Sequence, residues 1–173
     1  MIDKINQIVD MVREVAIVNA SDVPFKEYVV EACKQNACGR YAKTWTCPPA
    51  VGDIGTLRGK WQSYTSAIVF TTCHEIEDSF DIEGMEEARV KHEQITDRVL
   101  SLFDIEEVGV LSAEGCNLCE VCTYPTSPCR YPDLARQSVE SNGISVVELA
   151  QQTGIHYKNE PNTVTYFSII FLK

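Results

Sequence analysis

Residues 65–73 read Thr65-Ser66-Ala67-Ile68-Val69-Phe70-Thr71-Thr72-Cys73, a run of apolar and β-branched side chains. Such a run is typical of a strand that is buried within a sheet. The segments on either side predict alternating strands and helices, which indicates an α/β or α+β fold with a mixed sheet flanked by helices. A length of 173 residues suits one domain, so residues 1–173 are expected to form a single cysteine-rich domain.

Hydrophobic periodicity and residues that begin or end helices define the other elements. The expected strands are 16–19, 25–31, 107–112 and 162–172. The expected helices are 3–15, 84–103, 132–141, one that begins at Asp53, and one that Ser145 caps and that ends before Gly154. His92 lies on the long polar helix and is expected to face solvent, whereas His156 is expected to make local hydrogen bonds. The cysteine-rich segments fall on connections at the ends of strands.

The most informative motif lies downstream, where Cys116, Cys119, Cys122 and Cys129 form a C-x2-C-x2-C-x6-C run. Thiols at intervals of three residues cannot converge from one strand face, but a loop can wrap them around one centre. Bacterial ferredoxins hold a cubane cluster with C-x2-C-x2-C-x3-C-P, so the first two spacings, which place the first three cysteines, match and the fourth cysteine is displaced. The run therefore predicts an iron–sulfur cluster, most readily of the 4Fe-4S type, with these four cysteines as ligands.

Zinc is the competing metal for this downstream run. Structural zinc sites usually take their ligands from two separated pairs, and a middle cysteine that belongs to both pairs fits that plan poorly. A disulfide knot or buried free thiols is the third interpretation, because unoxidised cysteine is often buried.

A second group lies upstream and consists of Cys33, Cys38 and Cys47. Gly39 permits a turn with positive φ, and Pro48 and Pro49 fix their own φ angles, so this segment is expected to form a rigid loop. Rigidity lowers the entropy cost of gathering metal ligands.

Three thiols are one short of a closed four-thiolate site. The missing ligand has three candidate sources. Cys73, beside His74, is one, although it also suits a buried core position. Cys129 could cross over from the downstream run, as happens in two-cluster ferredoxins. The position could also stay open to water or substrate, which would make this an enzyme site.

The charge and composition of the chain limit the classes of partner that it is expected to bind. The chain has 15 basic and 25 acidic residues and a net charge of −10, which argues against nucleic acid and anionic membranes. An acidic surface is compatible with a basic redox partner, although it also simply confers solubility. Arg130 and Arg136 flank the downstream run, where they could stabilise a negatively charged cluster or form ordinary ion pairs.

No signal-peptide pattern and no apolar stretch of membrane-spanning length are visible, so a cytoplasmic location is expected. In a reducing compartment, eight cysteines are better explained as metal ligands than as disulfides. The fingerprints G-x-G-x-x-G and G-x4-G-K-[ST] are both missing, so nucleotide binding has no support from the sequence.

Two motifs in order resemble a known family. The motifs are Cys38-Gly39-Arg40-Tyr41 through Trp45-Thr46-Cys47-Pro48-Pro49, and Cys116-Asn117-Leu118-Cys119 with Cys129-Arg130-Tyr131-Pro132. Together with residues 137–144, they are similar to the prokaryotic predicted metal-binding proteins catalogued as domain of unknown function 2284. The similarity covers roughly residues 25 to 157. It implies metal or iron–sulfur binding and supplies no reaction.

Three functions are compatible with these motifs. The leading one is an iron–sulfur protein that exchanges electrons with a redox partner. The second is a metalloenzyme whose upstream site has an exchangeable position for a small substrate. The third is a zinc-stabilised binding module.

Overall fold

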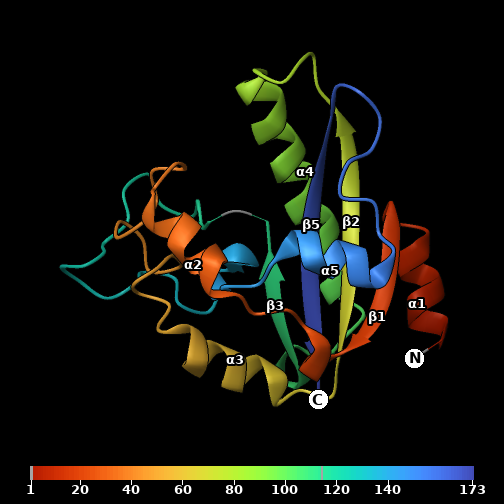
Figure 1. The fold of residues 1–173 in the computed structure, drawn as a ribbon, viewed down its shortest axis with the longest axis horizontal. Coiled ribbons are helices and arrows are strands. Elements are labelled where there is room, and N and C mark those ends of the chain that lie inside the picture. The colour runs from red at the N-terminus through yellow and green to blue at the C-terminus, as the bar shows by residue number, and fades with distance from the viewer. Residues whose placement is uncertain (1, 114) are drawn as a thin grey trace.

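A mixed five-stranded sheet forms the centre of the computed structural model, which describes residues 2–113 and 115–173 (Figure 1). The strand order is β1-β2-β5-β3-β4. Each neighbouring pair from β1 through β2 and β5 to β3 is antiparallel, and only β4 runs parallel to its neighbour β3. The strands are β1 (Glu14–Asn19), β2 (Ser66–Glu75), β3 (Val108–Ser112), β4 (Gln137–Ser138) and β5 (Thr163–Leu172). The predicted mixed sheet with flanking helices is therefore confirmed, and the arrangement is α+β.

In the described part of the chain, five α-helices accompany the sheet. They are α1 (Ile2–Val9), α2 (Glu27–Lys34), α3 (Ile54–Gln62), α4 (Ile82–Leu100) and α5 (Val146–Thr153). Because side chains alternate across a strand, β2 contributes to two separate cores. Val69 packs in one core with Trp61 of α3 and Leu149 of α5. Phe70 packs in the other with Ile8 of α1 and Val99 of α4. Helices thus cover both faces, and β2 is buried as its sequence predicted.

The expected N-caps of two helices are confirmed. The Asp53 side chain accepts a hydrogen bond from the Thr56 amide, and the Ser145 hydroxyl accepts one from the Glu148 amide. Gly154 ends α5 in the left-handed conformation, with φ of 74°, which glycine adopts without steric cost. Within the described residues, no helix has the length and apolar character needed to cross a bilayer.

The prediction of a strand at 25–31 was wrong, because this segment forms α2. Tyr28, Val29 and Val30 favour a strand by propensity, but propensity is a weak preference that tertiary contacts override. The chain turns from an extended Lys26 into the helix, and only Phe25 makes an isolated bridge, to Ile144. The upstream cysteine segment therefore begins on a helix rather than at the end of a strand.

The prediction of a helix at 132–141 was also wrong. Gln137 and Ser138 instead pair with Leu111 and Ser112 of β3 as the short edge strand β4, and a single 3-10 turn follows at η3 (Glu140–Asn142). Pairing with β3 therefore outweighed the tendency of Pro132 to begin a helix. The first helix is likewise shorter than the predicted 3–15, because it ends at Val9, residues 10–13 form turns and bends, and Glu14 begins β1.

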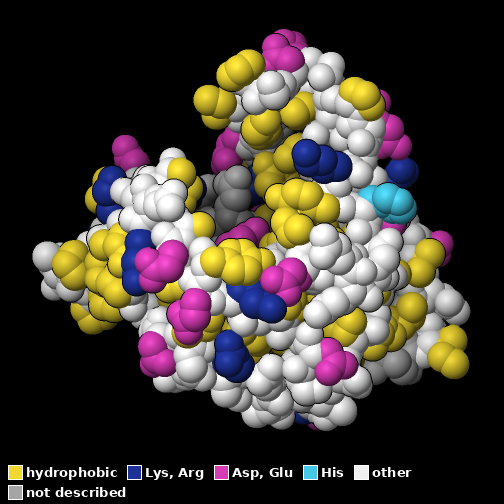
Figure 2. Space-filling model, in the orientation of Figure 1, with side chains coloured by type: hydrophobic (Ala, Val, Ile, Leu, Met, Phe, Trp, Pro, Cys, Tyr) yellow, Lys and Arg dark blue, Asp and Glu magenta, His cyan; other side chains and the backbone are white. Residues whose placement is uncertain are grey.

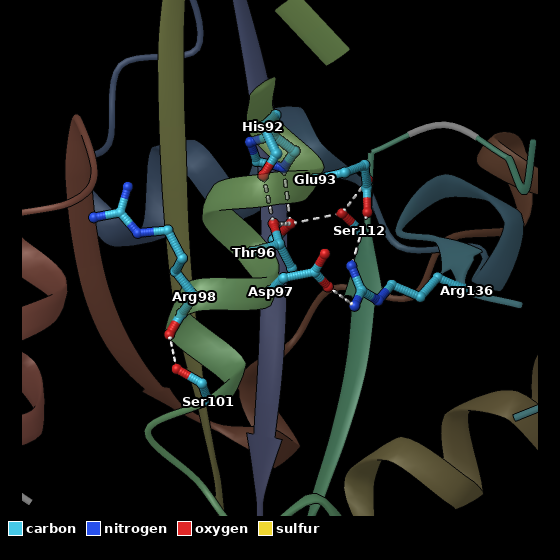
Figure 3. A network of polar contacts seen from close by, with 9 residues as sticks. His92, Glu93, Thr96, Asp97, Arg98, Ser101, Ser112 and Arg136 are labelled. Carbon is cyan, nitrogen blue, oxygen red and sulfur yellow. Dashed lines mark hydrogen bonds and ion pairs between the residues drawn. The ribbon is translucent and has the colours of Figure 1, made fainter. Parts of the chain in front are cut away.

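His92 is fully buried, so the expectation that it faces solvent was wrong. Its two ring nitrogens each lie 2.8 Å from a hydroxyl, those of Thr72 on β2 and Ser168 on β5. From Ser168, contacts continue to Ser112 and then to Glu93 (Figure 3). This network fastens α4 to three strands, and burial, followed by the charge of His74, lowers the pKa of His92 to about 3. The ring is therefore neutral at physiological pH.

Candidate metal centres

The two cysteine segments lie together at one end of the molecule, beyond β3 (Figure 1). The upstream segment runs from the end of α2 to Pro49, and the downstream segment follows β3. Both are built of turns and bends, with cis peptide bonds before Pro49 and Pro125. All eight cysteines are free thiols.

The downstream thiols surround one hollow. Cys116, Cys119, Cys122 and Cys129 all line it, and its volume is about 20 Å³. Burial raises the pKa of the Cys116 thiol, a hydrogen bond from the Leu118 amide opposes this, and the charges of the other three thiols raise it further. These electrostatic contributions reflect how close the four sulfur atoms lie. The structure therefore brings together the four residues that the spacing singled out.

The upstream thiols surround a different space. Cys33, Cys38 and Cys47 line a cavity of about 560 Å³ on the side of the loop that faces the sheet. Burial raises the pKa of Cys33, and the charges of Cys38, Glu140 and Cys47 raise it further. Cys47 is only 7% exposed, whereas Cys38 is exposed. This trio is also brought together.

Cys73 and Cys129 were the named candidates for a fourth upstream ligand. Cys73 lies within β2 opposite Thr165, and it is not among the described residues that line either cavity. Cys129 lies with the downstream trio. Among the described residues, no three cysteine, histidine or acidic side chains converge closely enough to hold a single metal ion.

One short segment separates the two sites and contributes to both. Thr44, Trp45 and Thr46 line the downstream hollow, and the next residue, Cys47, lines the upstream cavity. The Thr46 hydroxyl accepts a hydrogen bond of 3.2 Å from the Cys116 amide. The two sites are therefore back to back on a common wall.

Arg40 strengthens this wall. Its guanidinium donates to the Cys116 carbonyl at 3.1 Å and to the Asn117 side chain at 2.5 Å. Gly115 fits beneath it, since an added Cβ would lie 3.0 Å from Arg40 Cδ and 3.3 Å from Cys47 Sγ. Arg40, Thr46 and Gly115 were not singled out as site residues from the sequence, although Arg40 and Thr46 lie within the first family motif and Gly115 precedes Cys116.

The two arginines that were singled out have different surroundings. Arg130 donates to the Val121 carbonyl at 2.9 Å and so closes the downstream loop on itself. Arg136 pairs with Glu93 and Asp97 of α4 (Figure 3). For Arg136, this supports the ion-pair interpretation over direct stabilisation of a cluster.

Comparison with known proteins agrees with the arrangement of thiols. The model of a family described as "Predicted metal-binding protein (DUF2284)" matches residues 16–172. None of the curated proteins and none of the solved structures match the chain significantly. The family match includes both cysteine groups and every strand from Ser66 to Leu172. The chain therefore belongs to the DUF2284 family of predicted metal-binding proteins.

Proposed function

We propose that the downstream loop binds an iron–sulfur cluster, of the 4Fe-4S type, and that the protein uses it to exchange electrons with a redox partner. The observation that carries this proposal is that the four cysteines of a ferredoxin-like run line one common hollow. When bound, the cluster would supply a one-electron redox centre. Cys116, Cys119, Cys122 and Cys129 would be its ligands.

The spacing of the cysteines favours a cluster over a single zinc ion. Structural zinc sites usually take their ligands from two separated pairs, and Cys119 would have to belong to both pairs. The spacing of Cys116, Cys119 and Cys122 instead matches the ferredoxin run.

The hollow must widen to admit such a cluster. Its volume of about 20 Å³ is close to the space that one water molecule requires. The loop from 116 to 129 contains neither helix nor strand, and its four thiols are partly exposed. Thiols on such a loop can move outward without disturbing the sheet.

The surface around this loop is suited to electron exchange with another protein. Four large apolar side chains stand exposed on or beside it: Leu118, Val121, Tyr131 and Leu134. Figure 2 shows hydrophobic side chains gathered at the end of the molecule where Figure 1 places the loops. Exposed apolar groups of this kind often mark docking sites. A partner seated there would lie close to the four thiols.

Anaerobic purification tests the proposal directly. We expect brown protein that contains iron and acid-labile sulfide, and whose visible absorption bleaches on reduction. Stoichiometric zinc without sulfide would refute the cluster and leave the zinc-stabilised binding module as the better interpretation. A bound cluster that no reductant reduces would refute electron transfer alone.

A further inference from the structure

The upstream trio faces a cavity of a size that suits a small organic molecule. Its volume of about 560 Å³ lies within the range of about 300–1,000 Å³ that is typical of ligand sites. Cys33, Cys38 and Cys47 form part of its lining, while residues from β5 and the loop before it form another part. The space is distinct from the downstream hollow, because the two share no lining residue among those described.

The side chains that line this cavity do not supply a full set of four metal ligands. Among its described lining residues there is no fourth cysteine and no histidine, and Glu140 supplies the one carboxylate. The structure places the Cys33 thiol 3.9 Å from the Glu140 backbone carbonyl. A metal centre held by the three thiols would therefore have one position left for a group from outside the chain or for Glu140.

We propose that Cys33, Cys38 and Cys47 hold a second iron–sulfur centre whose fourth position opens to this cavity, and that the cavity binds a small planar organic molecule with a thiol donor. This inference rests on the proposed function in one respect only, which is that the protein binds iron. It assigns a different role to the second site, which is binding rather than electron exchange.

Aromatic side chains define the class of ligand. Tyr41, Tyr157, Tyr166 and Phe167 line the cavity. The rings of Tyr157 and Phe167 lie 6.1 Å apart between centroids and 35° from parallel. Aromatic faces favour the flat surface of a planar molecule. Tyr157 is 47% exposed, so a ligand that enters from solvent can reach it.

The charges at the cavity favour a ligand without a separate anionic group. Arg40 also lines the cavity, but its guanidinium is already engaged by hydrogen bonds to the Cys116 carbonyl and the Asn117 side chain. Glu140 and the three thiolates would repel a carboxylate or phosphate. A thiol donor is compatible with these charges, because it approaches as the neutral thiol and releases its proton to solvent as it binds the metal, and sulfur ligands match the softness of an iron–sulfur centre.

The upstream cavity lies next to the downstream site. Gly115, which precedes Cys116 in the chain, also lines the upstream cavity, and an added Cβ there would lie 3.3 Å from Cys47 Sγ. The two centres would thus be separated by little more than the shared wall.

Spectroscopy of the anaerobically reconstituted full chain tests this inference with two probes, cyanide and thiophenol. Cyanide reports only whether a coordination position is open, whereas thiophenol also needs the aromatic cavity. We expect both to shift the electron paramagnetic resonance signal of one centre and to leave the other unchanged. Tyr157→Ala should weaken thiophenol binding about fivefold without changing cyanide binding.

A matched control is Tyr28→Ala, because Tyr28 is also exposed, at 56%, and lines neither this cavity nor the downstream hollow. It should leave the affinity for thiophenol unchanged. A protein that loads only the downstream centre, or an upstream signal that neither probe shifts, would overturn the inference and leave the proposed function intact. If cyanide acts only after Glu140→Gln, the carboxylate fills the fourth position and the inference is also overturned. A protein without iron would refute both proposals.

Discussion

The two cysteine sites differ in how completely the chain surrounds them. Downstream, four thiols enclose a hollow of about 20 Å³, whereas upstream three thiols border a cavity of about 560 Å³. A full set of protein ligands leaves no position for a substrate, which suits electron storage and transfer. An incomplete set beside a large cavity suits ligand binding. The difference leads us to expect two kinds of thiolate site in one small fold, on opposite sides of residues 44–47.

The sites also differ in how the rest of the fold supports them. Cys33 belongs to α2 and Cys47 is buried, so the upstream trio is tied to the scaffold. The downstream loop is held mainly by contacts to other loop residues, such as the 3.0 Å hydrogen bond from the Trp45 indole to the Ser127 carbonyl. We therefore expect a bound metal to contribute more to the order of the downstream loop.

The largest expected effect comes from Cys119→Ser, which removes a ligand from the closed site. We expect loss of that cluster's iron and sulfide, with the upstream centre retained. The apparent free energy of unfolding should fall by at least about 4 kcal/mol, the value for a ligand present at a thousand times its Kd. Metal analysis and chemical denaturation under anaerobic conditions measure both quantities.

A matched control for this variant is Cys73→Ser. Cys73 is a half-buried cysteine on β2 and does not line either cavity. Its metal content should equal that of the unmodified protein. If Cys73→Ser removes metal while Cys119→Ser does not, the assignment of ligands in both sites is wrong.

Cys47→Ser is the reciprocal test, and it should remove the upstream centre alone. Cys47 lines only the upstream cavity, although it is one residue from the downstream wall. We expect iron to fall by one centre while the downstream spectrum stays unchanged. Simultaneous loss of both centres would mean that the two sites are one shared cluster site, which would remove the contrast between them.

His92→Gln tests the stability of the scaffold apart from both cysteine sites, because His92 is buried between α4 and the sheet. Burial lowers its pKa from 6.5 to about 3, so below pH 6.5 the unfolded chain binds a proton that the folded protein does not. Its contribution to stability is therefore complete above pH 6.5 and is lost as the pH falls towards 3. At pH 5, this loss amounts to about 2 kcal/mol.

Urea denaturation of both proteins at pH 7 and pH 5 measures this effect. The variant should be less stable at pH 7, because the hydroxyls of Thr72 and Ser168 lose well-placed partners. Between pH 7 and pH 5 it should lose about 2 kcal/mol less stability than the unmodified protein. Equal losses in the two proteins would show that His92 does not titrate as its burial requires. Metal content at pH 7 should not change.

The sequence predicted those elements whose signals are local and strong. The buried run at 65–73, the caps at Asp53 and Ser145, and the final strand all form as expected. The grouping of cysteines into two sets also follows their spacing, because a short loop can bring together only nearby residues.

The failures occurred where non-local contacts decide the structure. Gln137 and Ser138 form a strand only because β3 is there to pair with them. His92 is buried because two hydroxyls from distant strands satisfy its nitrogens, which a helical pattern cannot reveal. The wall between the two sites depends on Arg40 and Thr46 meeting Cys116, about 70 residues away, and on a cavity that only the folded chain defines.

The smallest and most specific effect is expected from Gly115→Ala, which adds one methyl group to the shared wall. That Cβ would lie 3.0 Å from Arg40 Cδ and 3.3 Å from Cys47 Sγ, so both neighbours must move by a few tenths of an ångström. We expect small spectral shifts at both centres without loss of metal. Gly59→Ala is the control, since Gly59 lies within α3 and an added Cβ meets nothing within 4 Å. It should raise stability by about 0.5–1 kcal/mol, because alanine favours a helix interior, and leave both spectra unchanged. A shift at only one centre in Gly115→Ala would mean that the wall isolates the two sites rather than connecting them.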